Sequence, residues 1–162
     1  MILKYRRRNV LPKWMRSVLR FGGWYNVFAG LAMATLYPQG FYLLGLPVPE
    51  VALPIQLAGV LVSVFGVGYL LVDKNPIENR NIMLLGLLSK SIGPLFAFFY
   101  IAMGMLPPVM IPILFFADLI YLIPFWMIWK RIGEYADAGQ ITMLQGVKGS
   151  KEPIKRRNKR AA

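Results

Sequence analysis

The fold is decided by the stretch from Ile82 to Trp129, which reads IMLLGLLSKSIGPLFAFFYIAMGMLPPVMIPILFFADLIYLIPFWMIW. Its only charged residues are Lys90 and Asp118. A Pro-Pro pair divides it into two apolar segments, each long enough to cross a hydrocarbon core of about 30 Å at about 1.5 Å per helical residue. We therefore predict two membrane-spanning helices, at residues 82–106 and 109–129, joined by a tight turn.

Two further apolar segments precede this stretch, at residues 21–44 and 52–72, and a short loop rich in Pro and Gly separates them. The helices of a soluble bundle would each need a polar face, and segments 52–72 and 109–129 have none. The predicted fold class is therefore all-α, an integral membrane four-helix bundle formed by residues 21–130.

The chain has 162 residues and a formal net charge of +12, and the charge is concentrated at its two ends. Residues 1–20 contain seven basic and no acidic side chains, and the part of the chain after the last apolar segment is also basic. Lys and Arg are retained on the cytoplasmic side of membrane proteins. We therefore expect both termini and the 73–80 loop to be cytoplasmic, and the 38–50 and 106–108 loops to face outward.

The basic residues 1–20 form the first of three predicted regions. Apolar and basic side chains alternate there at helical spacing, which predicts an interfacial amphipathic helix whose basic face meets anionic lipid headgroups. The residues assigned to this membrane surface are Arg6, Arg7, Arg8, Lys13, Trp14, Arg16 and Arg20. Residues 131–162 are predicted to be a largely disordered cytoplasmic tail. Because basic residues flank membrane spans for topological reasons alone, we do not expect nucleic-acid binding.

The chain contains neither His nor Cys. This excludes imidazole bases, thiolate nucleophiles, zinc fingers, Fe–S clusters and His-ligated haem. The predicted loops are also too short for a water-facing catalytic site. We therefore expect a protein that is not an enzyme and holds no metal and no fixed cofactor, with a quinone or a lipid as the remaining ligand candidates.

Small residues recur at helical spacing within the apolar segments and predict where the helices touch, because they allow backbones to approach closely. The residues assigned to helix packing are Gly59, Gly66, Gly86, Gly93 and Pro94. The proline also lacks an N–H, so the carbonyl of residue 90 loses its usual helical partner.

Lys90 and Asp118 are the strongest candidates for an intramembrane polar site. A charged side chain in a span costs about 2.5–3.5 kcal/mol on insertion scales, so it is normally retained for structure or function. The two lie at similar depth on antiparallel neighbours, but their side chains lean toward opposite helix N-termini, so a direct contact is not assured. The other polar candidates on these spans are Asn26, Gln56, Ser63 and Tyr121.

Four segments resemble parts of small bacterial four-span membrane proteins that are broadly DoxX-like: LGLPVP at 44–49, GVGY at 66–69, GLLSKSIGP at 86–94 and ADLIY at 117–121. The resemblance covers about residues 20–130, and the basic ends lie outside it. It implies a multi-pass protein of the bacterial cytoplasmic (inner) membrane, associated with membrane or quinone, without a defined reaction.

Three hypotheses for function follow. The first is a non-catalytic membrane subunit or accessory protein that stabilises a larger energy-converting or transport complex. The second is a small membrane protein that binds a quinone, lipid or other hydrophobic ligand through Lys90 and Asp118. The third is a proton-linked carrier that works as an oligomer. The expected partners are membrane lipids together with a membrane protein or further copies of the chain.

Overall fold

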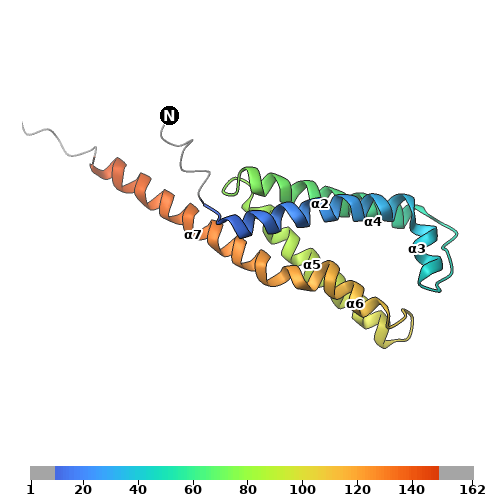
Figure 1. The fold of residues 1–162 in the computed structure, drawn as a ribbon. Helices are drawn as coiled ribbons and strands as arrows, with labels where there is room; N and C mark the ends of the chain where they lie inside the picture. The colour runs from blue at the N-terminus through green and yellow to red at the C-terminus, as the bar shows by residue number, and fades with distance from the viewer. Residues whose placement is uncertain (1–9, 150–162) are drawn as a thin grey trace, which may run out of the picture.

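The structure is a computed structural model, and it describes residues 10–149, with side chains described for residues 10–138. It is helical, with 81% of residues in helices and no strand in the described range, as Figure 1 shows. The elements, in chain order, are α2 (Lys13–Thr35), α3 (Tyr37–Leu43), α4 (Leu53–Lys74), α5 (Arg80–Ala102), α6 (Met110–Leu114), the π-helical turn η2 (Phe115–Leu119) and α7 (Ile120–Gly149). The predicted all-α class is confirmed.

Within the described residues, three helices are long and apolar enough to cross a membrane. They are α4, α5, and a continuous helical segment from Met110 to Ala138 that comprises α6, η2 and the first part of α7. By their length and composition, these three helices confirm the prediction of a membrane protein. Helix α2 is not among the three, because its mean hydropathy is lower: besides its basic residues it contains Trp24, Tyr25, Asn26 and three glycines.

The N-terminal prediction needs two corrections. Helix α2 runs without a break from Lys13 to Thr35, so the expected interfacial helix and the start of the first span form one element. The expected span 21–44 is in turn interrupted at Leu36, whose φ of −112° and ψ of 17° end α2 before the separate helix α3. Pro38, which has no N–H to donate, starts this second helix. Arg6, Arg7 and Arg8 lie outside the described residues.

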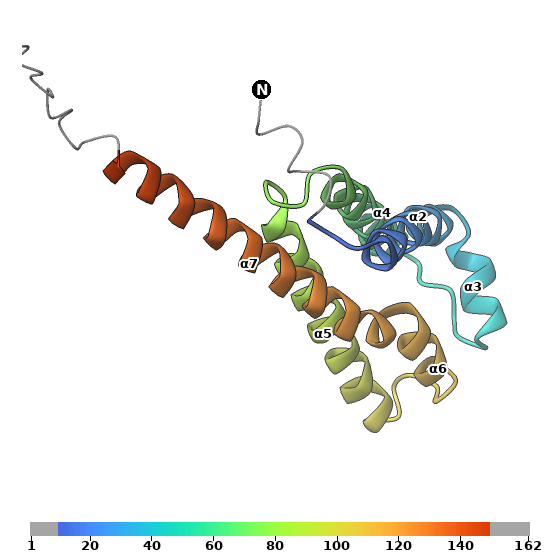
Figure 2. The same cartoon turned by 60° about the vertical axis from the view of Figure 1, so that its left-hand side comes forward.

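Helices α2 and α4 run side by side in opposite directions (Figures 1 and 2). Glycines hold them close: a Cβ added at Gly30 would lie 2.3 Å from the carbonyl oxygen of Gly59, and one at Gly66 would lie 2.6 Å from that of Gly23. The contacts repeat every seven residues on both helices, which is the spacing that keeps one face of a helix against its partner. A backbone-to-backbone contact therefore joins α2 to α4.

The buried core lies at one end of the molecule. It joins the start of α2, the end of α4, the start of α5 and the first half of α7. Its members are Val10, Leu11, Met15, Leu19, Tyr69, Val72, Met83, Tyr121, Phe125, Ile128 and Ile132. Away from this end, the α2–α4 pair and the pair formed by α5 with α6 separate, and α3 and α6 lie at the tips of two different arms (Figures 1 and 2).

Helix α7 extends far beyond the core, to Gly149 (Figure 1). This corrects the prediction that residues 131–162 are largely disordered, because the first part of that region continues the last apolar helix. The sequence up to residue 149 contains no Pro after Pro124, and so nothing in the backbone forces the helix to stop. Residues 150–162 lie outside the described part of the chain.

Candidate functional site

Lys90 and Asp118 form a direct ion pair between α5 and η2. The Lys90 ammonium nitrogen lies 2.9 Å from Oδ1 of Asp118 and also donates to the carbonyl oxygen of Ala117 at 2.9 Å. The lysine side chain is 5% exposed, whereas the aspartate side chain is 30% exposed. The ammonium group therefore depends on these two partners for its solvation.

The π-helical turn explains why the pair forms although the two side chains were expected to lean apart. A π turn bonds i to i+5 in place of i+4, which widens the helix locally and is common at functional sites. Asp118 and Ala117 both lie in this turn, and both offer an oxygen to the same ammonium group. The long lysine side chain spans the remaining distance from α5.

A tyrosine pair borders the ion pair. The Lys90 ammonium lies 5.0 Å from the centre of the Tyr121 ring, within the range of a cation–π contact. The Tyr121 ring stacks on Tyr25 of α2, with centroids 6.4 Å apart. This contact links the charged pair on α5 and η2 to the other helix pair.

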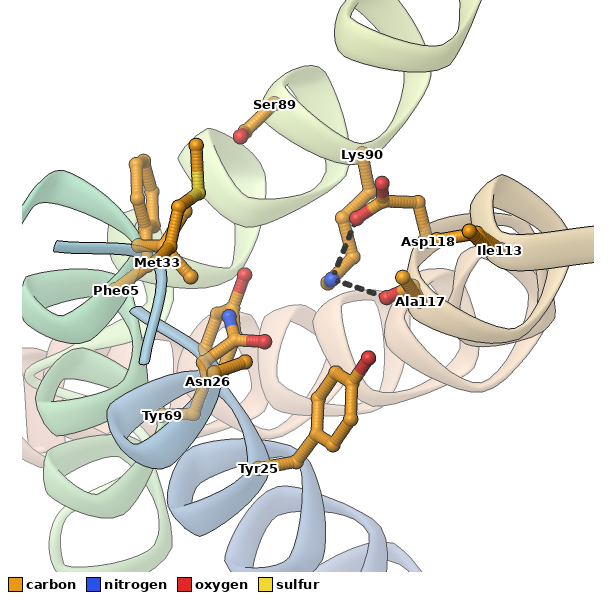
Figure 3. A pocket seen from close by; sticks show the side chains of 12 residues that line it. Tyr25, Asn26, Met33, Phe65, Tyr69, Ser89, Lys90, Ile113, Ala117 and Asp118 are labelled. Atoms are coloured by element: carbon orange, nitrogen blue, oxygen red, sulfur yellow. Dashed lines mark hydrogen bonds and ion pairs between the residues drawn. The ribbon is translucent and has the colours of Figure 1, made fainter. Parts of the chain in front are cut away.

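A pocket of about 290 Å³ opens between the two helix pairs beside this ion pair. Figure 3 shows Lys90 and Asp118 on one side and Asn26, Tyr25 and Tyr69 on the other. Apolar side chains from α2, α4 and α6 complete its wall: Ala29, Met33, Val62, Phe65 and Ile113. The two charges that line the pocket are of opposite sign, so its net charge is zero.

Two buried polar side chains face this pocket without a hydrogen-bond partner in the described residues. Asn26 is 5% exposed and Tyr69 is 1% exposed; neither the amide nor the hydroxyl is hydrogen bonded, and the surface that both polar groups retain borders the pocket. Buried polar groups are nearly always paired with protein or water. Tyr69 was not predicted as a site residue, because a tyrosine in an apolar segment resembles any other aromatic core residue.

Gln56 and Ser63 lie elsewhere. The Gln56 amide donates to the carbonyl oxygen of Ala34 at 3.3 Å, and the Ser63 hydroxyl donates to that of Val27 at 3.2 Å. Both bonds join α4 to α2. The structure thus places these two predicted site residues in the contact between those helices, and neither lines the pocket.

Some of the predicted packing residues lie in contacts between helices, and one does not. Gly59 and Gly66 lie in the α2–α4 contact, and a Cβ at Gly86 would lie 2.7 Å from the hydroxyl oxygen of Tyr69, so this glycine provides the space for that ring. Pro94 is buried within α5. Gly93 is a correction: a Cβ there would meet nothing within 4 Å, so it makes no contact between helices in the described chain.

A second charged cluster lies at the core end, where Asp73 binds two arginines. Its Oδ1 accepts from Nε of Arg16 and its Oδ2 from Nε of Arg20, both at 2.7 Å, and the aspartate side chain is 10% exposed. Arg16 and Arg20 are predicted to lie at the membrane surface, and the structure shows that both also join α2 to the end of α4 through Asp73. The Arg20 side chain remains 60% exposed, and Lys13 and Trp14 are exposed as well.

Comparisons of the chain with protein-family models, curated proteins and solved structures find no match. The DoxX-like resemblance therefore stays a prediction. In the described residues, no group of three or more acidic, His or Cys side chains is arranged to hold a metal ion.

Proposed function

We propose that this protein is a non-catalytic integral membrane subunit that packs against a larger membrane complex. The observation that supports this proposal most directly is the separation of the two helix pairs beyond their shared core. Large apolar side chains of the outer half of α5 remain exposed there, among them Leu95, Phe96 and Phe99. Lipid would cover these side chains, but helices from a partner would also bury the Asp118 side chain, of which 30% remains exposed.

The arrangement of charge fits the same proposal. The charged residues of the two clusters, at Asp73 and at Lys90, form ion pairs between helices, as a structural role requires. In this proposal α2, α4, α5 and the segment that starts at Met110 are the four spans. Both termini then lie in the cytoplasm of a bacterial cell and are anchored by basic residues.

Site-specific photo-crosslinking in native membranes tests the proposal. A photoreactive amino acid at Phe96, an exposed position on the outer half of α5, should capture one defined membrane protein in high yield. The same group at Tyr135, on the part of α7 beyond the core, serves as a matched aromatic control and should not capture that protein. Crosslinks from position 96 to lipid alone, or equal capture from both positions, would contradict the proposal.

A further inference from the structure

We infer that the pocket between the helix pairs binds the head of an uncharged amphiphile from the bilayer, one that carries at least two hydrogen-bond-accepting oxygens, as an ester or a dicarbonyl does. This site is independent of the proposed subunit role. Its argument rests on four features of the pocket: the unpaired polar groups, the net charge, the size and the position.

The unpaired groups define what the ligand must offer. The Tyr69 hydroxyl donates one hydrogen and the Asn26 amide donates two, and none of these is used within the described chain. The Lys90 ammonium has three N–H groups, of which two are directed to Asp118 and Ala117. The Asn26 carbonyl oxygen and the Tyr69 hydroxyl oxygen can also accept, but the four unused N–H and O–H groups need acceptors, and a ligand with two accepting oxygens would supply them.

Because the pocket has no net charge, we do not expect it to bind ligands with a charged head group. Lys90 and Asp118 neutralise each other at 2.9 Å, so an anion would have to compete with the aspartate and a cation with the lysine. Either ion would also lose its hydration on entering a largely apolar pocket, and this loss is not repaid without a charged partner. An uncharged head meets neither cost.

Size and position identify the source of the ligand. A volume of about 290 Å³ lies near the lower end of ligand pockets, roughly 300–1,000 Å³, and accommodates a head group but not a complete lipid. Lys90 follows the start of α5 by ten residues, or about 15 Å at 1.5 Å per residue, which places the pocket near the middle of that helix. Exposed apolar side chains of α5 follow the pocket, among them Leu95, Phe96 and Phe99, so we expect the ligand to enter from the lipid and to keep its chain there.

The test uses the full chain in phosphatidylcholine nanodiscs and a diacylglycerol that carries a diazirine near its ester groups. We expect photo-crosslinks to residues that line the pocket. Dioctanoylglycerol or a short-chain quinone should displace the probe. Stronger displacement by dioctanoylglycerol would identify the ligand as a glycerolipid, and stronger displacement by the quinone would identify it as a quinone. Decanoate and decylammonium should displace it at least tenfold more weakly.

Variants connect this binding to the unpaired groups. Tyr69→Phe and Asn26→Leu each remove one hydrogen-bonding group and should weaken probe binding roughly fivefold. Tyr135→Phe makes the same chemical change outside the pocket and should leave binding unchanged. The thermal midpoint of each variant, measured in the same nanodiscs, should not fall for Tyr69→Phe, because the lost hydroxyl has no protein partner.

Three results would overturn the inference. These are crosslinks that map outside the pocket, equal displacement by charged and uncharged competitors, and unchanged binding in the folded Tyr69→Phe variant. If Asn26→Leu does not fold, the Tyr69→Phe result decides alone.

Discussion

The ammonium group of Lys90 lies 2.9 Å from the carboxylate of Asp118, and the two residues belong to neighbouring helices that meet at a π-helical turn. The lysine side chain is nearly fully buried, whereas the aspartate retains some exposure. A buried pair of this kind is costly to break, but its replacement by two apolar residues is often neutral, because both desolvation costs disappear together.

Removal of one partner should therefore cost more than removal of both. Asp118→Leu leaves the buried ammonium without its counter-charge and should lower the free energy of unfolding by about 3–5 kcal/mol. The double variant Lys90→Met, Asp118→Leu should return to within about 1 kcal/mol of the original protein. Reversible unfolding in detergent micelles measures both values. A double variant as unstable as the sum of the two single variants would show that Lys90 and Asp118 stabilise the fold independently of each other, and would contradict the pairing.

The apolar spans were predictable from sequence, because a lipid environment demands long uncharged helices and leaves a clear pattern. The break at Leu36 was not predictable in the same way, since an apolar turn between two helices has the same hydropathy as a continuous helix. The Lys90–Asp118 contact depends on one extra residue in a helical turn. Hydropathy and side-chain direction in an ideal α-helix do not contain that information.

The role of Arg16 shows a second limit. A basic residue beside a membrane span is ordinarily expected to contact lipid headgroups. The residue that Arg16 actually binds, Asp73, is 57 residues away in the chain. A signal was nevertheless present: Arg16, Gly23 and Gly30 are spaced by seven residues, and so are Gly59, Gly66 and Asp73. Reading the two series as one antiparallel register would have paired the arginine with the aspartate.

Loss of the Asp73 carboxylate should loosen the core end of the α2–α4 pair. In Asp73→Asn, the guanidinium groups of Arg16 and Arg20 lose their charged acceptor, and a hydrogen bond to a charged group contributes about 1.5–3 kcal/mol. We expect a fall of that size in the free energy of unfolding. Glu50→Gln makes the same chemical change at an exposed loop position and should have no measurable effect. Equal stability of the two variants would refute a structural role for the cluster.

Alanine substitutions at two glycines should have opposite effects. A Cβ at Gly30 would lie 2.3 Å from the Gly59 carbonyl oxygen, so Gly30→Ala should force α2 and α4 apart at a cost of about 1–3 kcal/mol. A Cβ at Gly93 meets open space, so Gly93→Ala should be neutral or stabilise α5 by up to about 1 kcal/mol. Thermal unfolding of the two variants in one detergent measures the difference. A destabilised Gly93→Ala would place that glycine in a contact with a partner or a second copy.

The last prediction concerns which side of the membrane each end of the molecule faces. Because the chain has no Cys, single cysteines can be introduced without removing others. Lys74 is exposed at the core end of α4, and Glu50 is exposed in the loop that precedes α4, so the two positions lie at opposite ends of one apolar helix. Basic residues are retained in the cytoplasm, which places Lys74 inside and Glu50 outside. A membrane-impermeant maleimide should therefore label Glu50→Cys in intact cells and Lys74→Cys only after the membrane is opened. Labelling of both positions in intact cells would mean that α4 does not span the membrane, and the reverse pattern would invert the proposed topology.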